Sequence, residues 1–207
     1  LKLILDALSP LGDTYIKDLN NAFKTGWVDS INNKGKRGGA YSTSSYNTHP
    51  YVLMSYEETL SDVSTLAHEM GHAMHSYYSS INQTYQDHDY KIFVAEVASQ
   101  VNEILLYRYL LDTSDNKEFK IKIIDGLLQK YQGAIYRQAM FSEFELFIHD
   151  MSEKGEILTK DIMNDKYYEL NKLYFGPNVV VDDLIKYEWS RIPHFYYNFY
   201  VYQYSIG

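Results

Sequence analysis

The spacing of apolar and polar residues predicts a mainly helical chain with a small β-sheet. Residues 1–24 have apolar positions at helical spacing, interrupted at Ser9-Pro10. Residues 39–45 and 51–54 are instead typical of short strands that could pair, because turn-forming residues bound them. Longer helical patterns cover residues 55–81, 92–111, 117–153 and 159–174, the third with a break expected near Gly126 or Gly133.

The helix expected from residue 55 separates an apolar face from a histidine-rich face. Ser55 followed by Glu58 matches a capping box, which predicts the helix start there. At about 100° per residue, His68, His72 and His75 share one face. The opposite face carries apolar residues at steps of three and four: Leu60, Val63, Ala67, Met70 and Met74.

The segment His68-Glu-Met-Gly-His72 has the H-E-x-x-H pattern of metal-binding helices. Residues four apart project from the same side of a helix, so two imidazoles can reach one ion. Glu69 is turned by about 100° from His68, where it can take a proton from water without binding the ion. The pattern therefore predicts half of a catalytic metal site.

A catalytic zinc site needs a third protein ligand and keeps one position for water. Position 78 is Tyr, which excludes the metzincin pattern with a third histidine there. The next helix carries a polar stripe in which Glu96 comes first, and Glu103 lies two turns further along the same face. We expect Glu96 to bind the metal and Glu103 to orient a ligand. Apolar neighbours predict that this helix is mostly buried: Ile92, Phe93, Val94, Val97 and Val101.

Three segments of the chain resemble the catalytic domain of a known enzyme family. They are residues 68–75, residues 93–100 (FVAEVASQ) and residues 192–204 (IPHFYYNFYVYQY). Together with residues 35–42 and 48–51, they look like the oligoendopeptidase F type of the thimet oligopeptidase family of zinc metallopeptidases. The resemblance implies a zincin-like metallopeptidase catalytic domain and covers nearly the whole chain.

The resemblance also implies the chemistry of the site. His68, His72 and Glu96 would bind one Zn²⁺ per chain, and Glu69 would be the general base. The enzyme would then be a zinc metalloendopeptidase, hydrolysing internal bonds of short oligopeptides with a zinc-activated water. His194, Tyr202 and Tyr197 are the expected donors to the oxyanion formed during the reaction.

Family members are longer than 207 residues. We therefore expect residues 1–207 to be a single catalytic domain, a fragment without the N-terminal region and the extreme C-terminus of its parent. The missing parts of the same polypeptide would complete the substrate channel.

The composition of the chain argues against several other classes of function. A net charge of −8 argues against binding to nucleic acid or to an anionic membrane surface. No apolar run approaches the roughly 20 residues of a membrane span. The absence of cysteine excludes thiolate metal sites and agrees with the expected cytoplasmic location.

Two other classes of protein could contain such a histidine-rich helix. A di-iron helical bundle needs two E-x-x-H motifs, and only Glu69 is followed by histidine at the third position, so this class is excluded. A metal-binding or interaction helical module without turnover remains open.

Overall fold

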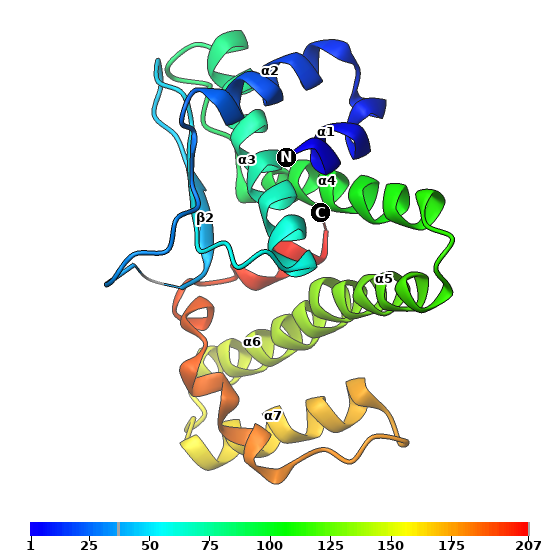
Figure 1. Cartoon of the computed structure of the whole chain (residues 1–207). Coiled ribbons are helices and arrows are strands. Elements are labelled where there is room, and N and C mark those ends of the chain that lie inside the picture. Colours follow the sequence, from blue (N-terminus) through cyan, green and yellow to red (C-terminus); the bar gives the residue numbers. More distant parts are fainter. Residues whose placement is uncertain (37, 207) are drawn as a thin grey trace. The chain divides into compact units, whose positions relative to one another are not determined.

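Helices make up most of the structure, as the sequence pattern predicts. The computed structural model describes residues 1–36 and 38–206, which divide into two compact units, residues 1–127 and 128–206 (Figure 1). Each unit has its own apolar core. The fold class is therefore mainly α with a small sheet, as expected.

The first unit contains the sheet and the helix with the histidines. In chain order its elements are α1 (Lys2–Ala7), η1 (Ser9–Leu11), α2 (Asp13–Lys24), β1 (Val28–Asp29), β2 (Ala40–Thr43), β3 (Tyr51–Met54), α3 (Leu60–Asn82), α4 (Ile92–Thr113) and α5 (Lys117–Tyr131), in which the unit boundary falls. η1 separates α1 from α2 at the expected interruption, Ser9-Pro10. The polar loop 83–91 joins α3 to α4.

The three strands form one sheet in the order β1-β3-β2. β2 pairs antiparallel to β3 with Ala40 opposite Met54, which confirms the expected pairing. β1 pairs parallel to β3 with Val28 opposite Val52. The sequence pattern missed β1, because two residues are too few to show an alternation.

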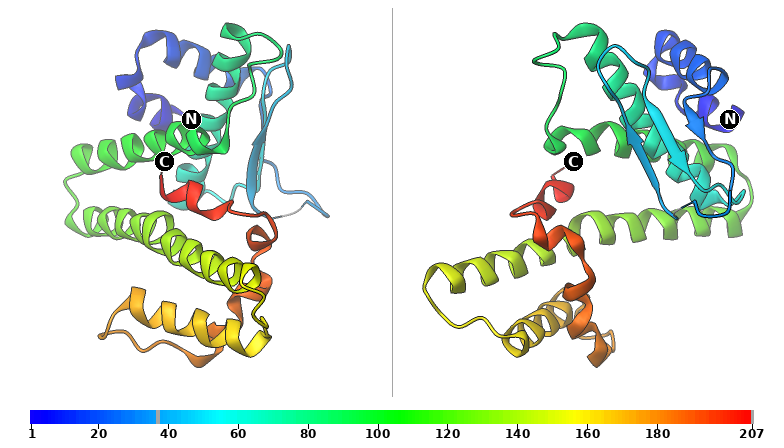
Figure 2. Two further views of the ribbon diagram at one scale, coloured as in Figure 1. Left: turned by 180° about the vertical axis from the view of Figure 1, so that it is seen from behind. Right: turned by 90° about the vertical axis from the view of Figure 1, so that its left-hand side faces the viewer.

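Helix α3 packs against both the sheet and α4 (Figures 1 and 2). Met70 and Met74 lie in the core beneath the sheet, with Val52 and Met54 of β3. Ala67 belongs to a second cluster, together with residues of α4 such as Leu106 and Leu110. The apolar face predicted for this helix is thus buried at its centre.

The predicted start of α3 was wrong by one turn. Thr59, not Ser55, is the N-cap: its Oγ1 accepts a hydrogen bond from the backbone N of Asp62 (3.1 Å). Asp62 Oδ2 in turn accepts one from the backbone N of Thr59 (3.0 Å), which completes a capping box. Glu58, with φ of +61°, precedes the helix in the left-handed region, so it cannot provide the predicted cap partner. The short Asp carboxylate replaces the Glu of the usual pattern.

Helices α3 and α4 approach each other most closely at Gly71. A Cβ atom there would lie 2.6 Å from Ser99 Cα and 2.7 Å from the Ala98 carbonyl oxygen, shorter than real contacts allow. One turn away, Asn102 Nδ2 of α4 donates a hydrogen bond to the Ala67 carbonyl of α3 (3.1 Å). The two backbones are therefore almost in contact.

The expectation that α4 is buried on most sides was wrong. Glu96 and Glu103 are buried, at 6% and 7% exposed, whereas Phe93, Val94 and Val101 are 40–43% exposed. The first half of the helix turns its polar stripe toward α3 and these apolar residues outward, whereas Leu106 and Leu110 in its second half are buried. Sequence spacing alone could not reveal this inversion, because it assumes that apolar residues face the core.

The second unit surrounds its core with helices and short 3-10 turns. Its elements after α5 are the π-helical segment η2 (Gln132–Tyr136), α6 (Arg137–Glu153), α7 (Lys160–Phe175), η3 (Asp183–Arg191), η4 (Pro193–Tyr196) and η5 (Val201–Ser205). The expected break near Gly133 takes the form of the π-helical segment, and Gly126 lies within α5. The core packs residues of α6 and α7 with Ile192 and Val201 of the C-terminal segment.

Buried carboxylates fix the C-terminal segment of the second unit. Glu188 accepts hydrogen bonds from Arg137 (2.8 Å) and from the Tyr167 hydroxyl (2.7 Å). Burial alone would raise the pKa of Glu188, but these two partners outweigh it, and the pKa is lowered. Glu145 accepts a hydrogen bond from the backbone N of Phe199 (2.6 Å), a residue with φ of +55°. These contacts hold the aromatic tail in an irregular course.

The close approach of α3 and α4 predicts the effect of Gly71→Ala. The added methyl group has to push the two backbones apart, so we expect the free energy of unfolding to fall by about 1–3 kcal/mol. Urea denaturation measures this change.

Gly133→Ala is the matched control, because no atom lies within 4 Å of a Cβ at this helical glycine. There we expect a neutral or slightly stabilising effect, since alanine reduces the entropy of the unfolded chain. Equal stabilities of the Gly71→Ala variant and the unmodified chain would contradict the tight contact.

Candidate metal centre

Three predicted ligands meet between α3 and α4. The ligand atoms of His68, His72 and Glu96 all lie within 4.8 Å of one another. Glu96 Oε2 is 3.4 Å from His68 Nε2 and 3.8 Å from His72 Nε2. The structure thus brings the two histidines of one helix and the glutamate of the next into one cluster.

These separations fit a single small cation. Zinc bonds of 2.0–2.2 Å in tetrahedral geometry place ligand atoms roughly 3.3 Å apart. Two imidazole nitrogens and one carboxylate oxygen are also the donor set of a catalytic zinc site that keeps one position open. The cluster therefore needs only small side-chain adjustments to hold an ion.

Glu103 orients the ring of His68. Its Oε2 lies 3.2 Å from His68 Nδ1, and its Oε1 accepts a hydrogen bond from Ser64 Oγ (3.0 Å). With Nδ1 engaged in this way, Nε2 of His68 is the atom directed at Glu96. A carboxylate behind a ligating histidine fixes its tautomer and increases its basicity.

The ligand from α4, Glu96, is also restricted by hydrogen bonding. Ser99 Oγ donates to Glu96 Oε2 (3.0 Å) and is close enough to share its proton with the Glu96 carbonyl (3.0 Å). Ser99 therefore restricts the rotation of the Glu96 side chain before any metal binds.

The electrostatics of the cluster are dominated by carboxylates. Burial alone would lower the pKa of His68, but the hydrogen bond and charge of Glu103, with the charge of Glu96, raise it above the ordinary imidazole value. Burial and the neighbouring His68 lower the pKa of His72. A bound cation needs both imidazoles neutral and would replace a proton in this negative surrounding.

Glu69 is buried beside the cluster, at 7% exposed. Burial raises the pKa of its carboxyl group, and the charges of Glu96 and Glu103 raise it further, while His68 opposes them. A carboxylate with a raised pKa is better matched to accepting a proton near neutral pH. A role for Glu69 as the general base stays a prediction.

His75 shares the helix face of the ligands but is absent from the cluster. Its ring stacks on Tyr90, with the ring centroids 3.7 Å apart and the planes at 15°. Burial lowers the pKa of His75. Its ring thus packs against the loop before α4 instead of joining the three clustered side chains.

The predicted oxyanion donors lie in the second unit. His194 stacks on Tyr200, with ring centroids 5.6 Å apart, and lines a cavity of about 320 Å³ within that unit. Tyr197 and Tyr202 are exposed. The metal cluster belongs to the first unit, so a role for these three residues at the metal stays a prediction.

Several supporting residues were missed by sequence reasoning. Ser64 and Ser99 bind the carboxylates of the cluster, Asn102 joins α4 to α3, and Gly71 permits their contact. Ser99 lay in the polar stripe but had no assigned role. Gly71 stands inside the H-E-x-x-H motif, and a glycine in the middle of a helix was the available signal for a close backbone contact.

Two motif histidines on one helix and a glutamate from the next define the zincin-like class of metallopeptidase domains. Comparison with family models agrees, since residues 5–207 match peptidase family M3. The chain therefore belongs to peptidase family M3.

Individual relatives support the same family. The chain is 48% identical over 204 residues to oligopeptidase PepF of Bacillus subtilis, covering 99% of this chain and 30% of that protein. It is 42% identical over 207 residues to the chromosomal oligoendopeptidase F of Lactococcus lactis subsp. cremoris, covering 100% of this chain and 34% of that protein. The chain thus spans about a third of the length of these relatives.

Solved structures share the fold. A crystal structure from Chlamydophila abortus superimposes with a TM-score of 0.83 at 48% identity, covering 99% of this chain and 34% of that one. The crystal structure of oligoendopeptidase-F from Enterococcus faecium gives a TM-score of 0.66 at 35% identity, covering 99% of this chain and 29% of that one.

Among the described residues, no helix is both long and apolar enough to cross a membrane.

The contact between Glu103 and His68 predicts a loss of metal affinity in Glu103→Gln. The amide cannot supply the negative charge that increases the basicity of the ligating nitrogen of His68, so we expect zinc affinity to fall about 10- to 100-fold. Competition with a chromophoric chelator measures the affinity.

Glu118→Gln, an identical change at an exposed residue of α5, is the control and should leave zinc affinity unchanged. Circular dichroism shows whether each variant is folded. Unchanged affinity in folded Glu103→Gln would remove Glu103 from the support of the metal.

Proposed function

We propose that this chain is the metal-binding catalytic part of a zinc peptidase that hydrolyses internal bonds of short oligopeptides. The observation that carries the proposal is the convergence of His68, His72 and Glu96 with a buried Glu69 beside them. The family and the named oligopeptidase relatives support peptides as the substrate class.

His68, His72 and Glu96 would hold one zinc ion per chain. Zinc is favoured over other divalent ions by two imidazoles and one carboxylate in a site that leaves a position open. When bound, zinc polarises a carbonyl oxygen and lowers the pKa of water toward neutrality. The three ligands supply the position for this chemistry, and Ser99 and Glu103 restrict two of them to it.

Glu69 would move the proton during hydrolysis. Its carboxylate accepts a proton from the water that attacks the peptide carbonyl carbon. It then returns that proton to the amide nitrogen as the carbon–nitrogen bond breaks. The products are a carboxylic acid and an amine, so atoms and charges balance without a further reactant.

The edge of the sheet offers a place for the peptide backbone. Among the strands of the described residues, β2 pairs with β3 on one side only, so its other edge can form hydrogen bonds to an extended peptide. Ser42 and Ser44, on and next to this strand, line a cavity that also touches His72. A peptide along β2 would therefore lie close to the metal ligands.

Further parts of the proposal come from the family resemblance. His194, Tyr202 and Tyr197 would donate hydrogen bonds to the negative oxygen that develops during the reaction. Residues 1–207 would act as one catalytic domain, with other parts of the same polypeptide completing the substrate channel. A cytoplasmic location is proposed on the same basis.

The assigned role of Glu69 predicts that Glu69→Gln keeps the metal and loses hydrolysis. The amide cannot accept a proton, so kcat on an internally quenched peptide should fall by at least about 10²-fold. Zinc content measured by mass spectrometry should stay at that of the unmodified chain. The peptidase assay uses the zinc-loaded protein and reports cleavage positions by mass spectrometry.

Two other outcomes of these peptidase assays would contradict parts of the proposal. Hydrolysis that continues in Glu69→Gln would remove this residue from the mechanism. A zinc-loaded, folded chain that cleaves no peptide would instead support a metal-binding module without turnover.

A further inference from the structure

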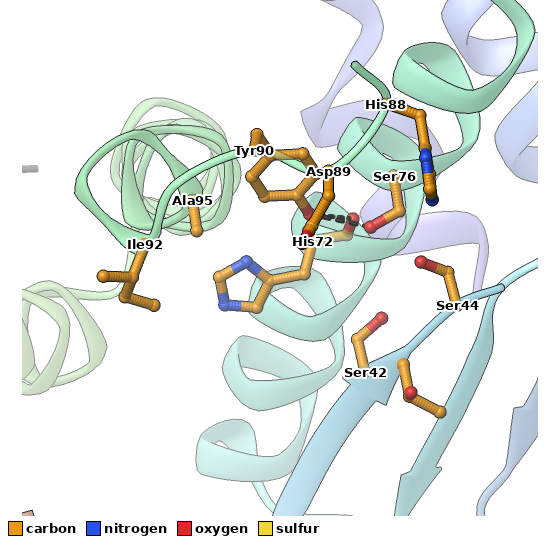
Figure 3. Close-up of a pocket in the computed structure, with 10 residues that line it drawn as sticks. Ser42, Ser44, His72, Ser76, His88, Asp89, Tyr90, Ile92 and Ala95 are labelled. Carbon is orange, nitrogen blue, oxygen red and sulfur yellow. Dashed lines mark hydrogen bonds between the residues drawn. The ribbon is translucent and has the colours of Figure 1, made fainter. Parts of the chain in front are cut away.

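A polar cavity opens beside the metal cluster within the first unit. It has a volume of about 360 Å³, and we name it the β2 pocket (Figure 3). The residues that line it include Ser42, Ser44, His72 and Asp89. Because His72 belongs to the metal cluster, a group in this pocket would sit next to the reacting bond of a bound substrate.

Asp89 is the one carboxylate among the described lining residues of the β2 pocket, which also include the imidazoles of His72 and His88. Neither lysine nor arginine lines the pocket within the described part of the chain. The hydroxyls of Ser42, Ser44 and Ser76 can accept hydrogen bonds as well as donate them. The described lining thus offers acceptors and a negative charge, which suit a cationic group.

The loop segment that carries Asp89 is fixed through the residues on either side of it, Tyr90 and His88. Next to it, the Tyr90 hydroxyl hydrogen-bonds to Ser76 (2.7 Å), and its ring stacks on His75. On the other side, Ser79 Oγ donates to the carbonyl of His88 (2.5 Å). Both anchors come from α3, so the loop holds Asp89 at a set distance from the metal ligands on the same helix.

The side of the pocket across from Ser42 and Ser44 is apolar. Figure 3 shows Ile92 and Ala95 of α4 on one side of His72 and these two serines on the other. A long side chain with a hydrocarbon stem and a charged end has this combination of surfaces. Lysine and arginine are the peptide side chains of this kind.

We propose that the β2 pocket is a specificity subsite for a lysine or arginine side chain adjacent to the cleaved peptide bond, with Asp89 as its charged partner. The inference rests on the proposed peptidase function, because it assigns a substrate preference to the same site. A glutamate side chain would be repelled, and a neutral side chain of equal length would lose only the ionic contact.

Binding of short blocked peptides tests the proposal without turnover. Three tripeptides of the form acetyl-Ala-Xaa-Ala-amide, with lysine, norleucine or glutamate at Xaa, are titrated into the zinc-loaded Glu69→Gln chain and followed by amide NMR shifts. We expect lysine to bind about fivefold more tightly than norleucine, the effect of one solvent-exposed ion pair. The shifts should centre on Ser42, Ser44 and Asp89.

Two variants assign this preference to a residue. Asp89→Asn should bind lysine and norleucine equally. Asp87→Asn removes the same charge two residues earlier, outside the pocket, and should keep the preference. Equal binding of lysine and norleucine by the unmodified pocket would overturn the proposal, and so would a lysine preference that survives in Asp89→Asn.

The binding assay also separates this inference from the proposed function. A chain that cleaves peptides but shows no Asp89-dependent lysine preference contradicts the subsite alone. A chain that prefers lysine through Asp89 yet cleaves nothing, with its own Glu69 in place, supports the subsite and contradicts the peptidase.

Discussion

The near-contact between the backbones of α3 and α4 at Gly71 is the constraint on which the site depends. A metal site built from two helices needs ligand atoms within a few ångströms, and ordinary helix pairs are kept 8–10 Å apart by their side chains. Glycine at position 71 removes the side chain at the crossing. As a result Glu96, one turn before Ser99, reaches both histidines of α3. The same contact lets Asn102 and Glu103 bind α3 further along.

The second feature is an excess of buried negative charge. Glu69, Glu96 and Glu103 are all buried around two imidazoles, and carboxylates are costly to bury without a compensating cation. Burial raises the pKa of Glu69, and the charges of Glu96 and Glu103 raise it further. Burial lowers the pKa of His68, but Glu103 and Glu96 outweigh it and raise this pKa. A divalent cation at the cluster supplies the missing positive charge. The hydrogen bonds from Ser64 to Glu103 and from Ser99 to Glu96 restrict the orientation of these two carboxylates.

Sequence reasoning predicted that His68 and His72 lie together because a helix places residues four apart on one side, whatever surrounds it. His68 and His72 follow from that rule, and Glu96 followed from a polar stripe in an apolar segment. The rule could not tell which face of α4 is buried, so exposed Phe93 and Val94 were misjudged. It also placed the N-cap at Ser55, because Thr59 and Asp62 form a less common variant of the same motif. Pairings between distant residues, such as Ser64 with Glu103, depend on tertiary contacts that local spacing does not encode.

The central claim is that α3 and α4 together create one metal site, with Glu96 as the ligand from α4. Zinc stoichiometry and affinity of the purified chain, compared with Glu96→Ala, test it most directly. The predicted result is about one zinc per chain, and a folded variant whose affinity is at least about 100-fold lower because one of three protein ligands is gone. Equal zinc affinity in the folded Glu96→Ala variant, or no zinc binding by the unmodified chain, would contradict the claim.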